Sequence, residues 1–412
     1  MEIFKVNGIK ILYKQNKKLP IVWARVFTGV AAGREDTAGI ANLCARIMSK
    51  STLKRNVAQL SKDIDSIGAS LETDMDYDFS AISISSLSNY FSQSLEILAD
   101  VIINPAFNES EIEFEKKNVL ASISARRDSI SKTARDAFAR EYFNRTPFAN
   151  PIAGNIESVK SISKENIKNW RAKAYNAREI LIVVAGNVSK AEVKVAVEKY
   201  FSALPKGKVL PIPKTNFPKL SGKRVNISGK FSQAYILKGY TAPDIKNENF
   251  ATLKVITALL GSRMSARLFV ELREKLGLAY EVNALYPTFV NKSYFGVYMG
   301  LDKKNVGLAE RKMEEILKDL GINKVSRAEL KNVQNYISGV YLLDRQTLGR
   351  QSYYLGWREI TGLGYKYDEK YLKQILKVTP QDIYKAAKKY FNNPALTVTV
   401  MPEEKPKTAK LK

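Results

Sequence analysis

The chain of 412 residues contains no histidine and a single cysteine, Cys44. Because imidazole and thiolate are the usual protein ligands of zinc, this chain alone cannot assemble a zinc site of the usual kind. One cysteine also excludes a disulfide within the chain. Its position on the apolar side of an expected helix favours a small core residue over a nucleophile, and the redox compartment is left open.

Long apolar runs are missing as well. No uninterrupted stretch approaches the roughly 18 apolar residues that a membrane-spanning helix needs. The first residues, Met-Glu-Ile-Phe-Lys, do not form a signal peptide. We therefore expect no membrane span.

Acidic residues are few compared with basic ones. Lysine and arginine number 66 and aspartate and glutamate 41, which gives a net charge of +25. The lysines are spread along the chain, and no basic run alternates with aromatic residues as an RNA-binding sheet would require. We expect no nucleic-acid partner, and interpret the charge as a solvated surface or as attraction to an acidic partner or acidic peptides.

The length and the hydrophobic content of 45% predict two domains of about 200 residues each. Between Pro205 and Pro218 lie four of the 14 prolines, which is typical of an extended and semi-rigid connector. We place an N-terminal domain at residues 1–204, a proline-rich linker at 205–222 and a C-terminal domain at 223–412.

The two halves resemble each other. The segment from Ile162 to Val184 recurs from Val378 to Val400, at a constant offset of 216 residues (378 − 162 and 400 − 184). Each copy predicts a serine or threonine N-cap, an amphipathic helix, a short turn and a β-branched strand. A register kept across all these features indicates an internal duplication.

Strands and long helices are mixed in each half. The patterns predict an α+β fold, built twice, in which a mainly antiparallel or mixed sheet is covered by helices on one side. The expected strands are Ile21–Gly29, Phe79–Ser85, Gln233–Tyr240 and Ser293–Gly300, and the expected helices include Tyr90–Ile102 and Val306–Leu320.

The segment Asp36–Lys50, DTAGIANLCARIMSK, predicts a short amphipathic helix. A zinc-binding helix with the motif H-x-x-E-H needs its residues at i, i+3 and i+4, because these positions share one helix face. At this spacing the chain has Asn42, Ala45 and Arg46. A permanent guanidinium charge at Arg46 should repel a divalent cation.

With its flanking residues, this segment resembles the zinc-binding helix of the pitrilysin (insulinase) metallopeptidases. The resemblance implies that Asn42 and Arg46 stand at the two histidine positions and Ala45 at the glutamate base. It also implies that the third ligand, a glutamate on a second helix, falls at Ser122. All four functional positions therefore lack the required residue, and we expect no zinc in this chain.

A second motif is the segment GSRMSARLFVELREKLGLAY, from Gly261 to Tyr280. By itself it predicts an amphipathic helix over Ser265–Lys275, a helix end at Gly277 and a strand that begins near Tyr280. On that basis Arg273 is a surface charge and Tyr280 a packing residue. In the pitrilysin family, a similar segment carries an arginine and a tyrosine that reach the zinc site of a facing domain, and Arg273 and Tyr280 match them.

Four acids, Glu72, Asp74, Asp76 and Asp78, alternate with larger residues. On a strand they would share one face, at about 7 Å intervals. No calcium-loop glycine pattern accompanies them, so neutralisation of nearby lysines is favoured over metal binding. The family resemblance makes this an edge strand beside the active cleft, where the acids attract basic peptide segments.

With these residues at the family's functional positions, the resemblance implies the non-zinc subunit of a heterodimeric zinc peptidase, which we expect to be inactive alone. Its partner would be a similar chain that carries H-x-x-E-H, the distal glutamate and the zinc, while Arg273 and Tyr280 bind the peptide or unfolded protein and stabilise the oxyanion.

Two other functions stay open. One is a non-catalytic scaffold subunit of a larger assembly, and the other is a stand-alone peptide-binding protein that offers its edge strand. A metallopeptidase that uses only carboxylates is the weakest alternative, because of Arg46 and Ser122. The compartment is not determined. Family resemblance favours the periplasm or cell envelope if a leader was removed, and the cytoplasm otherwise.

Overall fold

The computed structural model describes residues 1–211 and 220–403, which form parts of two compact units. Unit 1 contains residues 1–123, 341–368 and the described part of 146–215. The remaining described residues, including 124–145, belong to unit 2. Each unit thus takes one segment from the opposite half of the sequence. Residues 212–219 of the expected linker lie outside the described part, and the expected domain limits remain predictions.

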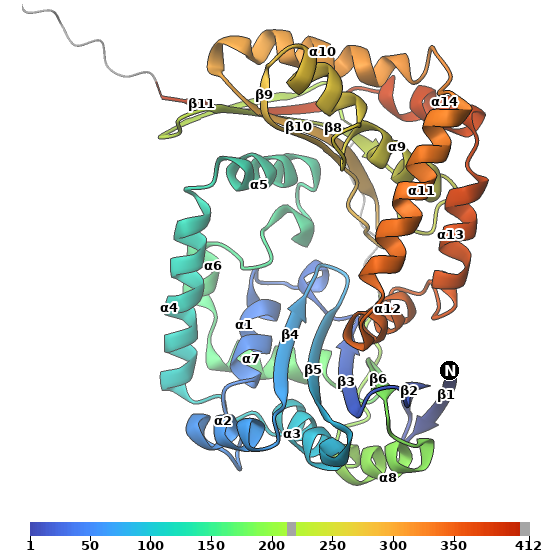
Figure 1. Ribbon diagram of the computed structural model, residues 1–412. Helices are drawn as coiled ribbons and strands as arrows, with labels where there is room; N and C mark the ends of the chain where they lie inside the picture. Colours follow the sequence, from blue (N-terminus) through green and yellow to red (C-terminus); the bar gives the residue numbers. More distant parts are fainter. Residues whose placement is uncertain (212–219, 404–412) are drawn as a thin grey trace, which may run out of the picture. The chain divides into compact units, whose positions relative to one another are not determined.

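Unit 1 is built on a six-stranded mixed sheet with the order β1-β2-β6-β3-β5-β4 (Figure 1). β2 and β6 are parallel, and the other neighbours are antiparallel. The central strand β6 reads ILIVVAG and is buried throughout, as expected for a strand covered on both faces. The strands are β1 (Glu2–Val6), β2 (Ile9–Gln15), β3 (Ile21–Thr28), β4 (Ser70–Met75), β5 (Ser80–Leu87) and β6 (Ile180–Gly186).

Unit 2 contains a five-stranded sheet with the order β7-β11-β8-β10-β9. Its strands are β7 (Arg224–Gly229), β8 (Ala234–Ala242), β9 (Ala279–Leu285), β10 (Ser293–Leu301) and β11 (Leu396–Pro402). β7 and β11 are parallel, like β2 and β6, so strands β7 to β11 reproduce the order of β2 to β6. β11 lies 216 residues after β6 (396 − 180), which confirms the predicted duplication.

The helices agree with the duplicated pattern. α7 and α14 are also 216 residues apart, and capping boxes at Ser163 and Thr379 fix their first turns. The helices of the described residues are α1 (Ile40–Met48), α2 (Val57–Ser66), α3 (Phe91–Ile103), α4 (Glu109–Arg126), α5 (Ile130–Tyr142), α6 (Ile156–Ser161), α7 (Lys164–Ala174), α8 (Lys190–Phe201), α9 (Phe250–Leu260), α10 (Val306–Asp319), α11 (Arg327–Asp344), α12 (Leu348–Ile360), α13 (Tyr367–Lys377) and α14 (Pro380–Phe391), with the π-helical segment η4 (Phe269–Lys275) and four short 3-10 turns. Within the described residues, none has both the length and the apolar character to cross a membrane.

Helices cover both faces of the unit 1 sheet, so the prediction of helices on one side was incomplete. On one face, residues such as Ile11, Val26 and Ile182 share a core with α1, α3, α7 and α8. On the opposite face, Leu12, Phe27 and Val183 pack under α12. The second layer was missed because α12 comes from the other half of the chain.

Two glycines let α12 lie close to the sheet. A Cβ atom at Gly356 would lie 2.0 Å from a ring carbon of Phe27, and one at Gly349 would lie 2.9 Å from Trp23. Phe27 is fully buried and packs against Phe79, so its ring has little room to move. The glycines are therefore required by the close approach of helix and sheet.

We expect Gly356→Ala to destabilise the protein by about 1–3 kcal/mol, because the added methyl group overpacks the contact with Phe27. Gly339→Ala on α11 is the matched control. No atom lies within 4 Å of a Cβ atom there, so this change should be neutral or stabilise by up to about 1 kcal/mol. Urea unfolding measures both, and equal midpoints would contradict the packing argument.

Unit 2 receives a helix in the reciprocal manner. α5 packs on β8 and β11 of its sheet. The ring of Phe138 covers Gly239 on β8, where a Cβ atom would lie 2.2 Å from the ring. The hydroxyl of Tyr142 donates to the carbonyl oxygen of Ser293 at 2.6 Å. α5 and α12 therefore play equivalent roles in the two copies.

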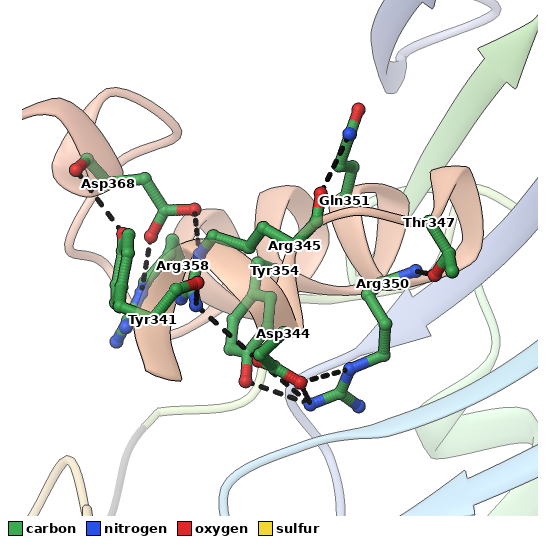
Figure 2. A network of polar contacts seen from close by, with 9 residues as sticks. All are labelled: Tyr341, Asp344, Arg345, Thr347, Arg350, Gln351, Tyr354, Arg358 and Asp368. Carbon is green, nitrogen blue, oxygen red and sulfur yellow. Dashed lines mark hydrogen bonds and ion pairs between the residues drawn. The ribbon is translucent and has the colours of Figure 1, made fainter. Parts of the chain in front are cut away.

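The segment that carries α12 is closed by a polar network (Figure 2). Asp368 accepts from Nε of Arg345 at 3.2 Å and from Nε of Arg358 at 3.4 Å, and its carbonyl oxygen accepts from the hydroxyl of Tyr341 at 3.3 Å. The guanidinium of Arg345 lies 3.4 Å from the ring centre of Tyr341 and 3.7 Å from that of Tyr354. Because Tyr341 and Asp368 are the ends of this unit 1 segment, the network ties its ends together.

Candidate functional site

α1 begins at Ile40 and ends at Met48, inside the predicted segment Asp36–Lys50. Gly39 precedes it with a φ of 91°, a conformation that favours glycine. The carboxylate of Glu35 accepts from the backbone N–H groups of Gly39 at 2.8 Å and Ala41 at 3.2 Å. This side chain therefore replaces the missing N-cap of α1.

Cys44 lies on the buried face of α1 and is fully buried, which confirms the predicted core residue. Its Sγ atom is 3.7 Å from both Sδ of Met48 and the carbonyl oxygen of Ile167. Burial raises the pKa of the Cys44 thiol to about 12. The thiol is therefore protonated at neutral pH and is not a nucleophile.

Burial also raises the pKa of Glu35 to about 8, although the N–H groups of Gly39 and Ala41 oppose this shift. Between the ordinary pKa of 4.5 and the raised value, the folded protein therefore holds one proton more than the unfolded chain. The free energy of unfolding should fall as the pH rises through this window, by up to about 1.4 kcal/mol per pH unit.

Glu35→Gln should remove this pH dependence, whereas Gln at the exposed Glu369 should leave it in place. Urea midpoints at pH 5, 6, 7 and 8 measure the slope of stability against pH for each variant. An identical slope with and without the Glu35 carboxyl would show that another group causes it.

The positions predicted for zinc ligands hold other side chains. Asn42 is half-buried, and Ala45 is only 1% exposed. Nε of Arg46 lies 2.8 Å from Oε2 of Glu115 on α4, and Nζ of Lys50 lies 3.0 Å from Oε1 of the same carboxylate. The Glu115 side chain is fully buried, whereas those of Arg46 and Lys50 are 43% and 38% exposed. The position of the second histidine thus belongs to an ion cluster with an internal carboxylate and cations at the surface.

Burial opposes the ionisation of Glu115, but hydrogen bonds from Lys50 and Arg46 outweigh it and lower the pKa of this carboxyl. Sequence reasoning did not identify Glu115 as a member of this site. The sequence did contain a signal for it: Glu115 lies on the same helix face as the apolar residues Ile112 and Val119, the buried side of α4. A carboxylate on an apolar helix face requires a buried partner.

These residues do not fit a zinc ion. Zinc prefers imidazole, thiolate and carboxylate ligands, whereas the predicted positions hold an amide, a methyl group, a guanidinium and the exposed hydroxyl of Ser122. Arg46 adds a fixed positive charge there. Among the residues that the structure describes, no group of three or more His, Cys, Asp and Glu side chains is arranged to hold a metal.

The predicted row of four acids is wrong in its second half. β4 is an edge strand, as predicted, but it ends at Met75, so only Glu72 and Asp74 lie on it. Asp76 lies in the turn before β5, where its carboxylate accepts from the N–H of Tyr77 at 2.6 Å. Asp74 pairs with Arg25 at 3.0 Å. The alternation of acids with larger residues continues past the end of β4 into the turn, where an aspartate side chain can hydrogen-bond the backbone and stabilise the turn. The sequence pattern therefore did not mark the end of the strand.

The second motif lies in unit 2 and differs from the prediction in its winding. The π-helical segment η4 starts at Phe269, directly after two α-helical residues, Arg267 and Leu268. A turn comes before these, with the N–H of Ala266 bonded to the carbonyl oxygen of Arg263. The segment ends at Lys275, as predicted. Gly277 has a φ of 61°, and β9 begins at Ala279, one residue before Tyr280.

Arg273 and Tyr280 are both exposed, the latter by 63%. In the described part of the chain, no carboxylate lies within 4 Å of the Arg273 guanidinium, which rests 5.1 Å from the ring centre of Phe269. Neighbouring cations are paired, since Lys275 bonds Glu271 at 2.7 Å. The Arg273 charge and N–H groups are therefore available to an external group.

Behind η4, a cavity of about 770 Å³ opens between this helix and α10. Its apolar wall includes Val270, Leu276 and Ile316. On its polar side, Arg267 bonds Glu329 through two contacts of 2.9 Å and Asp319 through one of 2.9 Å. Sequence reasoning missed this cavity, because its two walls are at least 36 residues apart (312 − 276) and no local pattern links them.

Two family models match consecutive parts of this chain. Residues 10–156 match the family model described as "Insulinase (Peptidase family M16)", and residues 161–337 match the one described as "Peptidase M16 inactive domain". A curated relative from Rickettsia bellii, named an uncharacterized zinc protease, is 24% identical over 401 residues, which cover 96% of each chain.

Two solved structures share the fold. The peptidase M16 inactive domain from Pseudomonas fluorescens has a TM-score of 0.90 at 21% identity and covers 98% of this chain and 99% of its own. A chain of complex III2 from Candida albicans has a TM-score of 0.83 at 16% identity, and the match covers 97% of this chain and 95% of the Candida chain. The two family matches together span both units, and the chain belongs to peptidase family M16, the insulinase family.

Proposed function

We propose that this chain is the non-zinc subunit of a heterodimeric M16 peptidase. Its partner is a homologous chain with H-x-x-E-H and the distal glutamate, which holds zinc and supplies the glutamate base. The present chain contributes Arg273 and Tyr280 to peptide binding and oxyanion stabilisation. Its substrate is a peptide or an unfolded protein segment.

One contrast between the two motifs carries this proposal. The first motif is closed, since Arg46 is bound to the buried Glu115 and no metal ligand remains at Asn42. At the second motif, Arg273 and Tyr280 are exposed. An exposed arginine that forms no ion pair in the described part of the chain keeps its charge and donors for another chain's site, whereas Arg46 already binds Glu115.

The chemistry fits this role. Hydrolysis of a peptide bond places negative charge on the scissile carbonyl oxygen. A guanidinium and a phenol that donate to this oxygen, or to neighbouring peptide carbonyls, lower the energy of the transition state. In this role both groups only donate hydrogen bonds.

A scaffold subunit is the second candidate, and the likeness to a chain of complex III2 from Candida albicans favours it. The two functions differ in one observable. A scaffold binds its partner without changing any rate, whereas a catalytic subunit changes the rate when it binds.

The test combines this chain with the H-x-x-E-H chain from the same genome, in the presence of zinc. Analytical ultracentrifugation measures the mass of the complex, and a quenched fluorescent peptide reports cleavage. We expect one chain of each kind in the complex, and cleavage only by the mixture. A complex that forms without cleavage supports the scaffold function. If the two chains do not form a complex, both functions are rejected.

A further inference from the structure

η4 is anchored firmly to the core of unit 2. Leu268, which precedes it, and Leu272 within it are fully buried. Two backbone bonds close its end, from the N–H of Gly277 to the carbonyl oxygen of Arg273 at 3.2 Å and from the N–H of Leu278 to that of Leu272 at 2.9 Å. Such π-helical turns are rare and occur frequently at functional sites. The backbone of Arg273 is thus held in place.

The Arg273 side chain has a different kind of support from the cations around it. Arg267 is fixed by Asp319 and Glu329, and each of those contacts uses part of its charge and its N–H donors. Arg273 instead lies over the half-buried ring of Phe269, four residues earlier on η4. An aromatic face attracts a cation without neutralising it.

We propose that Phe269 is a positioning residue for Arg273: the ring holds the guanidinium where a peptide carbonyl will meet it and leaves its charge and donors unused. This inference rests on the proposed function. An ion pair would hold the arginine as well, but it would weaken the interaction with a developing oxyanion. A preorganised donor also avoids the cost of reorganisation during the reaction.

Kinetics of the two-chain mixture provide the first test. Phe269→Leu should lower kcat more than it changes KM, by about two- to fivefold, the range expected for a cation–π contact at an exposed site. Phe269→Tyr, which keeps an aromatic face, should rescue the rate. In the background of Arg273→Ala, Phe269→Leu should cause no further loss, because its effect acts through the arginine.

A second readout uses this chain alone and needs no partner. The ring current of Phe269 should shift the ¹⁵N–¹H signal of Arg273 Nε, and Phe269→Leu should move this signal toward that of a free arginine and narrow its line. Thermal unfolding of each variant checks that the fold is kept.

The two readouts separate the possible failures. If the unaltered chain adds no activity to the zinc subunit, the proposed function is wrong. The Phe269–Arg273 contact then has no role in catalysis. If that mixture is active but Phe269→Leu changes neither kcat nor the Arg273 signal, only the positioning role is overturned.

Discussion

Arg273→Ala will lower kcat of the two-chain mixture by about a hundredfold or more, while the complex still forms. The size follows from the loss of one preorganised donor to the oxyanion, which costs on the order of 3 kcal/mol. The arginine is exposed, and its contact with the Phe269 ring is worth about 1 kcal/mol or less, so the change should alter the stability of the chain little.

Lys275→Ala is the matched control for this prediction. The lysine lies two residues from Arg273 on η4, is exposed and pairs with the partly exposed Glu271 at 2.7 Å, so its loss should change the rate little. Tyr280→Phe removes only the hydroxyl and should also reduce kcat, while keeping the ring. Equal kcat values for the Arg273→Ala and Lys275→Ala mixtures would contradict a specific role of Arg273 in catalysis.

The second large effect concerns stability. Replacing both Arg46 and Lys50 with methionine should destabilise the protein by about 3–5 kcal/mol, because Glu115 is then left as a buried carboxylate without a counter-ion. The same replacement at the exposed Lys54 and Lys62 should have an effect within about 1 kcal/mol. Urea unfolding at pH 7 compares the two pairs.

Adding Glu115→Gln to the Arg46 and Lys50 replacements should restore most of the stability, since no buried charge then remains. The pH provides an independent check. Without its two cations, Glu115 keeps the hydrogen bond from Asn118 but loses both positive charges, so burial raises its pKa and the deficit should shrink as the pH falls from 8 to 5. A deficit that is independent of pH and is not relieved by glutamine would mean that the two cations stabilise by packing.

Much of the fold could be predicted from local patterns. The apolar strand β6 and the capping box at Ser163 recur at the same offset in β11 and at Thr379, so the duplication was visible before the structure. Predicted strands and helices agree with the structure to within one or two residues, except around the hairpin after Met75, at the start of η4 and at the start of α1, which begins four residues after Asp36.

The exchange of α5 and α12 could not be predicted in the same way. An amphipathic helix specifies an apolar surface to cover, but not which of two similar sheets provides it. The evidence lay in Gly239 and Gly356, whose missing side chains matter only once Phe138 and Phe27 lie against them. Which sheet each helix covers is therefore determined by contacts between residues that are distant in the sequence.

The candidate site shows the same division. The residues at Asn42, Ala45, Arg46 and Ser122 predicted, from the sequence and the family resemblance, that this chain binds no zinc. The pairing of Arg46 with Glu115, 69 residues away, required the structure, as did the cation–π contact of Arg273. Whether Arg273 and Tyr280 act in catalysis depends on a second chain, and remains a prediction.

The most direct measurement of the shared site is a titration of the H-x-x-E-H subunit, at fixed concentration and with zinc, with increasing amounts of this chain. Initial rates of peptide cleavage are recorded at each ratio. The proposed function predicts a rate near zero at the start and a plateau at one chain per zinc subunit. A rate that stays constant over the whole titration would contradict it.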